Sequence, residues 1–207
     1  MTLTVTDDRA GTARRGRRLQ YATIAWNSGE FVVAVAAGVA SGSVALVGIG
    51  VDSALEVTSS VAALWRLRHD DDVARREAAE ARAQRMIGTC FVLLAVYVAW
   101  EAVESLLLGR EPETSWIGIA LAALSLVVMP ALVHFKRRVA RDLASGALAA
   151  ESRQTAICAW LSVFLLAGLG LNAWLGWWWA DAVAALLMSP LIVREGLAGL
   201  RGDACCD

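Results

Sequence analysis

Apolar residues run through this chain in six long blocks, separated by short segments that are polar or rich in glycine. A block of about 20 apolar residues matches the thickness of a lipid hydrocarbon core, so each block predicts a membrane-spanning helix. The predicted spans are Leu19–Ala40, Ser43–Trp65, Arg85–Leu108, Ser115–Phe135, Ala144–Gly176 and Trp178–Leu197. The pattern therefore predicts an all-α integral membrane protein, a six-transmembrane-helix bundle. Composition agrees, since 57% of the 207 residues are hydrophobic and the mean hydropathy is +0.54.

Little of the chain lies outside these blocks. We expect residues 1–18 to form a basic cytoplasmic segment, residues 19–200 the transmembrane domain, and residues 201–207 a short cytoplasmic tail with no further C-terminal domain. The charged, Ala-rich stretch Asp70–Arg85 predicts a helix that extends the third span out of the membrane.

Basic residues are distributed unevenly among the connections. They cluster before the first span, between the second and third, and between the fourth and fifth (Lys136, Arg137, Arg138, Arg141), whereas only Arg110 lies in a connection on the opposite side. The positive-inside rule then predicts that both termini are cytoplasmic, with the protein in the cell's inner (plasma) membrane. Short basic runs beside a bilayer favour contact with anionic lipid, so nucleic acid is not an expected partner.

The second span carries two carboxylates, Asp52 and Glu56, spaced four residues apart. A carboxylate inside a bilayer costs about 3 kcal/mol on insertion scales, so a membrane protein that keeps two of them is expected to use them. The spacing places both on one face of a helix, where they can grip a cation together. The alternative, in which they only join helices by hydrogen bonds, is the weaker reading for this pair.

A second pair at the same spacing, Gln154 and Cys158, lies in the fifth span at an overlapping depth. Either residue alone would be read as helix packing. Together the two pairs offer two carboxylates, a thiolate and an amide oxygen, which suit a tetrahedral divalent metal. Zinc fits best, with cobalt, cadmium, iron and manganese open as alternatives, and no resident cofactor is expected.

Accessory positions extend this polar face. Asn27 and Glu30 share a face of the first span, and Glu30 is read as a proton carrier, a secondary ligand or a hydrogen-bond partner. His69 with Asp70, and the tail cysteines Cys205 and Cys206, are candidates for capturing metal, although a solvated loop and a terminal tail are the more ordinary interpretations.

The stretch Ala36–Glu56 resembles the short loop and second helix of the cation diffusion facilitator family of divalent-metal/proton antiporters, where an Asp-x-x-x-Asp pair binds metal. The stretch Glu151–Cys158 is similar to that family's fifth helix, which usually carries His-x-x-x-Asp, and Trp179–Leu187 resembles the start of its sixth. This chain departs from the family pattern by having Glu56, Gln154 and Cys158 at ligand positions.

The resemblance implies secondary active metal efflux by alternating access, with protons exchanged for metal because both compete for the same ligands. It also implies a homodimer held by the transmembrane helices, the second and third spans above all. A non-transporting metal sensor or partner subunit is the alternative. An intramembrane enzyme is disfavoured, because the chain has no His-Glu-x-x-His motif and its histidines, His69 and His134, lie near span ends.

Overall fold

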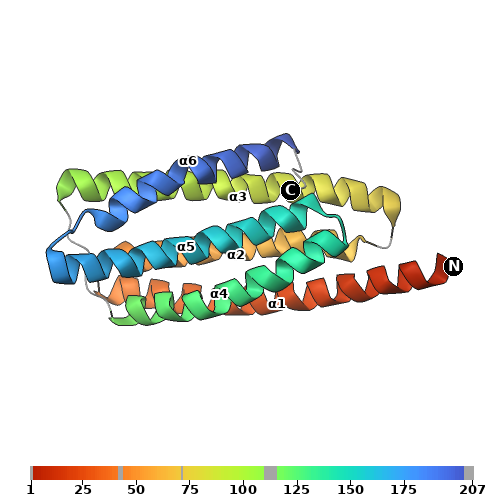
Figure 1. Cartoon of the computed structure of the whole chain (residues 1–207), viewed down its shortest axis with the longest axis horizontal. Coiled ribbons are helices and arrows are strands. Elements are labelled where there is room, and N and C mark those ends of the chain that lie inside the picture. The colour runs from red at the N-terminus through yellow and green to blue at the C-terminus, as the bar shows by residue number, and fades with distance from the viewer. Residues whose placement is uncertain (1, 42–43, 71, 110–115, 203–207) are drawn as a thin grey trace.

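The computed structural model describes residues 2–41, 44–70, 72–109 and 116–202, and these form a bundle of six helices without strands (Figure 1). The helices are α1 (Thr2–Ser41), α2 (Val44–Arg68), α3 (Val73–Leu108), α4 (Trp116–Asp142), α5 (Gly146–Leu175) and α6 (Ala180–Arg201). The predicted helical bundle is confirmed. The predicted extension of the third span is also present, since α3 begins at Val73. Helix α1 also runs through the basic N-terminal segment, since it begins at Thr2.

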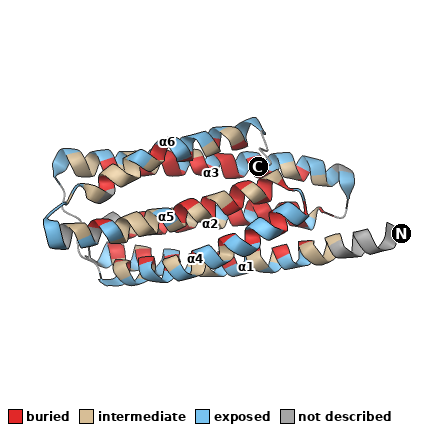
Figure 2. Cartoon of the chain, in the orientation of Figure 1, coloured by how far each residue is buried: buried red, intermediate tan, exposed pale blue. Residues whose placement is uncertain are grey.

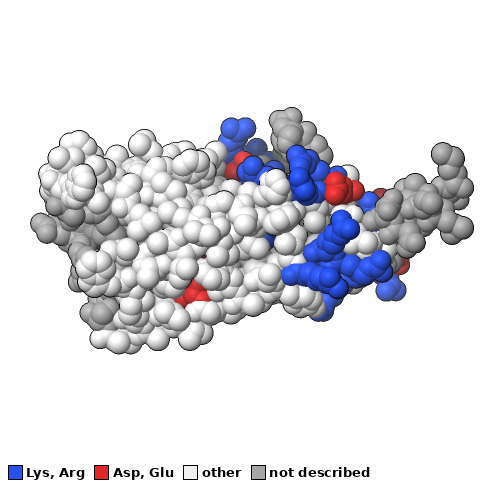
Figure 3. All heavy atoms as spheres, turned by 60° about the horizontal axis from the view of Figure 1, so that its bottom comes forward, with Lys and Arg blue, Asp and Glu red and all other residues white. Residues whose placement is uncertain are grey.

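Five of the helices, α1, α2, α3, α4 and α6, are long and apolar enough over their described residues to cross a membrane. Successive helices run in opposite directions, so the start of α1 and the end of α6 point towards the same end of the bundle (Figure 1). Lys and Arg side chains gather over this end of the molecule, and the opposite part of the same face is almost free of them (Figure 3). The sidedness predicted from the positive-inside rule stays a prediction that this distribution supports.

The helices pack chiefly in three pairs, α1 with α2, α3 with α6 and α4 with α5. Helices α2 and α5 also touch each other and link the pairs, and buried residues are frequent along both (Figure 2). One apolar cluster, which includes Ile87, Phe91, Leu94 and Ile192, joins α3 to α6 and α5. Because α2 and α5 are central, polar side chains on their facing sides are removed from lipid.

Helices α3 and α6 approach most closely at glycine. A Cβ atom added at Gly88 would lie 2.7 Å from the Leu200 backbone nitrogen, and one at Gly199 would lie 2.8 Å from the Gly88 Cα. Small residues at such a crossing let two backbones meet, which is a main source of helix association in lipid. The α3–α6 pair is therefore fixed by backbone contact.

Four charged residues close the bundle at the end nearest the N-terminus, and we call Arg9, Arg66, Asp70 and Glu80 the Arg66 cluster. The Arg66 guanidinium donates to Asp70 Oδ1 at 2.7 Å and to Glu80 Oε2 at 2.5 Å. The Arg9 guanidinium donates hydrogen bonds to both Asp70 carboxylate oxygens, at 2.9 and 3.0 Å. Glu80 also accepts hydrogen bonds from Ser145 Oγ and the Ala147 backbone N–H at the start of α5. Every charge in this cluster has a partner.

Candidate metal site

The predicted ligands on α2 and α5 meet in the centre of the bundle. The Cys158 thiol donates a hydrogen bond to Asp52 Oδ1 over 3.2 Å, although the two residues are 106 positions apart in the chain. Cys158 also lies beside Glu56, one turn further along α2. The sequence spacing thus gives three potential ligands, Asp52, Glu56 and Cys158, that face one another across the α2–α5 contact.

Glu56 is the least satisfied group in this region. Its side chain is 1% exposed, and neither carboxylate oxygen has a hydrogen-bond partner. The nearest opposite charge is the Lys136 ammonium, with Nζ 3.8 Å from Glu56 Oε1. A buried carboxylate without hydrogen bonds is expensive, and native proteins keep such a group where it has something to bind.

Gln154 is fully buried one turn before Cys158, and its Oε1 accepts a 2.6 Å hydrogen bond from Ser59 Oγ while its Nε2 has no partner. Ser59 is also within hydrogen-bond distance of the Leu55 carbonyl oxygen. Turning the amide by 180° lets Nε2 donate to Ser59 Oγ while that hydroxyl donates to Leu55. The Gln154 oxygen is then free to act as a neutral ligand.

Two accessory candidates, Asn27 and Glu30, lie on α1, which packs against α2. Glu30 accepts hydrogen bonds from Ser53 Oγ at 3.0 Å and Ser125 Oγ at 2.6 Å. Asn27 donates to the Thr23 carbonyl oxygen, and its own Oδ1 is buried without a partner. Of the three readings of Glu30, its contacts match the hydrogen-bond partner, because both of its oxygens are held by hydroxyl groups.

Next to Glu56, the structure adds two charged residues that the sequence did not single out as site residues. Lys136 was assigned to the cytoplasmic basic cluster, but α4 continues to Asp142 and Lys136 is buried inside the bundle. It makes an ion pair with Glu151 of α5 and donates to Thr155 Oγ1 at 2.8 Å. A usable signal was present, since Lys136 continues the inward stripe of Ser125, Met129 and Val133 at helical spacing.

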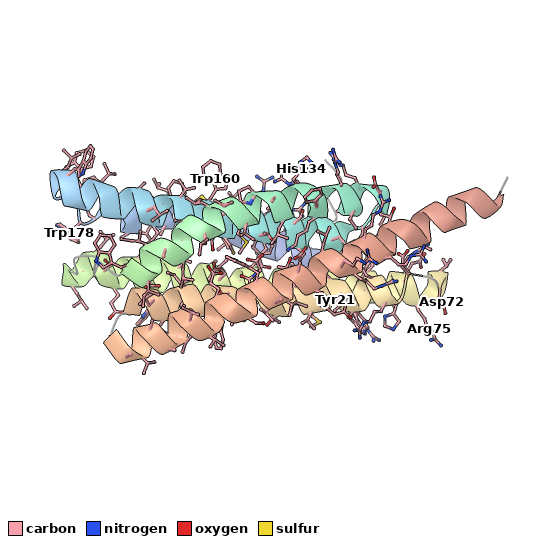
Figure 4. All side chains as sticks on the ribbon, turned by 90° about the horizontal axis from the view of Figure 1, so that it is seen from below. Tyr21, Asp72, Arg75, His134, Trp160 and Trp178 are labelled. Atoms are coloured by element: carbon pink, nitrogen blue, oxygen red, sulfur yellow. The ribbon has the colours of Figure 1, made fainter. Side chains whose placement is uncertain are left out.

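The remaining candidates lie away from this region. Asp70 is engaged by Arg9 and Arg66, and His69 Nδ1 is 2.8 Å from the Trp65 carbonyl oxygen. His134 projects from the outer surface of α4 (Figure 4). Cys205 and Cys206 lie outside the described residues. Among described positions, no three His, Cys, Asp or Glu side chains converge closely enough to hold an ion as they stand.

One turn nearer the α1–α2 connection, Gly48 makes room for polar groups of α3. A Cβ atom at Gly48 would lie 2.2 Å from the Tyr97 hydroxyl oxygen and 3.1 Å from Glu101 Oε2. A third carboxylate, from Glu101, therefore approaches α2 one turn from Asp52, on the side away from the Arg66 cluster.

The sequence also matches a known protein family. The sequence pattern of the cation efflux transmembrane domain matches residues 21–201, which is nearly the whole described bundle. The chain belongs to the cation efflux family. The resemblance to cation diffusion facilitators drawn from Ala36–Glu56 and Glu151–Cys158 is thereby confirmed.

Relatives of this cation efflux domain are named as transporters or pumps. An uncharacterized transporter of Synechocystis is 28% identical over 167 residues, 78% of this chain and 54% of the relative. The cation-efflux pump FieF of Klebsiella pneumoniae is 26% identical over 168 residues, 76% of this chain and 54% of the pump. FieF of Shewanella oneidensis is 28% identical over 118 residues, 57% of this chain and 38% of the pump. The chain thus spans about half the length, or less, of these relatives.

Proposed function

We propose that this cation efflux domain exports a divalent metal cation, with zinc as the main substrate, in exchange for protons. The observation that carries the proposal is the buried Glu56 carboxylate, whose oxygens accept no hydrogen bond, beside the Asp52–Cys158 contact. A cation placed between them would supply what Glu56 lacks. The relatives' names, which include cation-efflux pumps, support the direction of transport.

Zinc is proposed because of the chemistry of the donors. Two carboxylates and a thiolate offer both hard and soft ligands, and a Gln154 oxygen completes a tetrahedral set. Small movements of Glu56 and of the Gln154 amide would close this set around an ion. Cobalt, cadmium, iron and manganese are alternatives that differ in their demand for sulfur.

Proton exchange is proposed because the thiol proton of Cys158 now occupies the contact with Asp52. A metal must displace that proton before the sulfur can bind, so metal and proton cannot share the site. When the site is exposed to the opposite side of the membrane, protons return to the ligands and release the metal. Alternating access of one site therefore couples the two flows.

The location follows from the charge distribution. With the Arg66 cluster at the cytoplasmic end of a plasma-membrane protein, metal would reach Asp52 from that end. It would leave past Glu101, which approaches α2 on the opposite side of the site. Exposed apolar side chains of α3, among them Leu93, Val96 and Trp100, offer a face for a homodimer through the membrane helices.

The test is zinc flux into proteoliposomes under an imposed pH gradient. The wild type is expected to carry zinc, and Asp52→Asn to carry none. Asp72→Asn is the matched control, because it makes the same chemical change at an exposed carboxylate that pairs with Arg75 at the end of the bundle. It should transport normally.

Wild-type protein that binds zinc but carries none of the five candidate metals would contradict the proposal and favour the metal-sensor alternative. Zinc flux that persists in Asp52→Asn would show that transport does not require the Asp52 carboxylate.

A further inference from the structure

Lys136 is the one lysine in the sequence, and its side chain is 1% exposed. An ammonium group inside a membrane bundle is costly unless it is paired. Here it makes an ion pair with Glu151, which also accepts hydrogen bonds from Ser60 Oγ at 3.1 Å and Gln20 Nε2 at 3.2 Å. Glu151 is therefore satisfied by three helices at once and does not depend on Lys136 alone.

Counting donors shows that the ammonium has one N–H left over. An ammonium carries three N–H donors, and Lys136 uses two of them, on Glu151 and on Thr155. Lys136 makes no third hydrogen bond to any residue that the structure describes, and Glu56 Oε1 lies 3.8 Å from Nζ. Glu56 in turn lacks any hydrogen bond. A donor and an acceptor that are both unsatisfied thus face each other across a gap that a shift of about 1 Å would close.

We propose that Lys136 is a tethered counter-ion that takes the place of the metal at Glu56 when the carrier is empty. This inference rests on the proposed transport function and adds a residue to it. In the metal-free return step the ammonium moves from Glu151, where the structure places it, onto Glu56, and when a metal binds, repulsion between like charges returns the ammonium to Glu151. Glu151 and Thr155 together bind the ammonium in its second position.

The physical reason lies in the return step of the transport cycle. A carrier that has released its metal must change conformation again with protons on ligands such as Cys158 but without a metal cation beside Glu56. An uncompensated carboxylate buried in the bundle would oppose that movement, and the ammonium removes the excess charge without a bound ion. The same ammonium weakens metal binding, because it competes with the metal for Glu56.

Two variants should shift zinc affinity in opposite directions, measured by calorimetric titration of zinc alone into the purified chain. Lys136→Met keeps the side-chain volume and removes the competitor, so we expect binding tighter by about tenfold or more. Glu151→Gln removes the carboxylate that holds the ammonium away from Glu56. The ammonium then stays at Glu56, so we expect zinc to bind more weakly by about tenfold. Arg153→Met is the control, since it removes a cation from α5, the helix of Glu151, and the partner of that cation, Glu195, lies on α6.

A second readout separates this role from a structural one. In proteoliposomes, Lys136→Met should still exchange internal for external zinc, a process in which the carrier never returns empty, while net zinc flux falls at least about tenfold. A wild type that binds no zinc would refute the proposed function itself. Unchanged zinc affinity in both Lys136→Met and Glu151→Gln, or equal loss of exchange and net flux in Lys136→Met, would overturn the tethered counter-ion. If Lys136→Met does not fold, the weaker binding expected of Glu151→Gln decides the question.

Discussion

The Arg66 cluster and the Asp52–Glu56 region are built from similar groups and differ in how completely those groups are paired. In the cluster, Arg66, Asp70 and Glu80 each have charged partners within 3.0 Å. In the central region, both Glu56 oxygens and the Gln154 Nε2 atom are buried without hydrogen bonds. Pairing of the first kind holds helices together, whereas missing partners of the second kind indicate a place for a ligand.

The difference should first be visible in stability. Replacing Arg66 by Met leaves Asp70 and Glu80 beside an apolar side chain, and removing one partner of a buried ion pair costs about 3–5 kcal/mol. We expect a large drop in the free energy of unfolding, measured by denaturant titration of the purified protein. The fraction that remains folded should bind zinc as the wild type does. A stable Arg66→Met variant that no longer binds zinc would reverse the assignment of the two regions.

Glu56→Gln should have the opposite profile. It removes a carboxylate that has no hydrogen bonds, so the free energy of unfolding should stay the same or rise. Zinc affinity should fall by about 100-fold or more, because even residues that only support metal ligands are worth about 10–100-fold in affinity. Thermal unfolding with and without zinc measures both effects, since a ligand at about 100 times its Kd stabilises the folded state by about 2.7 kcal/mol. Loss of stability without loss of zinc binding would show that Glu56 is a structural residue.

Cys158→Ser sharpens the account of metal choice. The change replaces a soft ligand by a hard one, so affinity for cadmium and zinc should fall by about tenfold while affinity for manganese changes little. Competition titrations on one preparation measure the ratio. Equal losses for all three metals would indicate that Cys158 contributes to folding and not to coordination.

Ser59→Ala should have the smallest effect. It removes a neutral hydrogen bond to Gln154, worth about 0.5–1.5 kcal/mol, so zinc affinity should change by about twofold to tenfold. The matched control is Ser189→Ala, a buried serine of α6 that bonds only to the Ala185 carbonyl oxygen of its own helix. The same change in zinc affinity for both variants would show that Gln154 does not take part in binding the metal.

The fold could be predicted closely from the apolar blocks, because helix length in a bilayer is set by its thickness. The second predicted span, Ser43–Trp65, corresponds to α2, Val44–Arg68. The encounter of Asp52 with Cys158 followed from equal spacing on two helices of overlapping depth. Hydropathy could not predict where helices end outside the apolar blocks. Helix α1 starts at Thr2, whereas the first apolar block starts at Leu19.

The position of Lys136 could not be predicted from charge alone. A Lys-Arg-Arg run after an apolar block is typical of a cytoplasmic connection, and Arg137 and Arg138 are exposed as that pattern predicts. Lys136 differs because α4 continues and turns this one residue towards Glu151. The partner residue determines its role, and a pairing between distant residues is visible only in three dimensions.

The central claim is that Cys158 and Asp52 together bind the transported metal. The most direct measurement is the ultraviolet thiolate-to-cadmium charge-transfer band, recorded on titrating cadmium into a variant whose other cysteines, Cys90, Cys205 and Cys206, are replaced. We predict a saturable band in this background that disappears in Cys158→Ser and weakens strongly in Asp52→Asn. No band in the background, or one that persists after Cys158→Ser, would contradict the account.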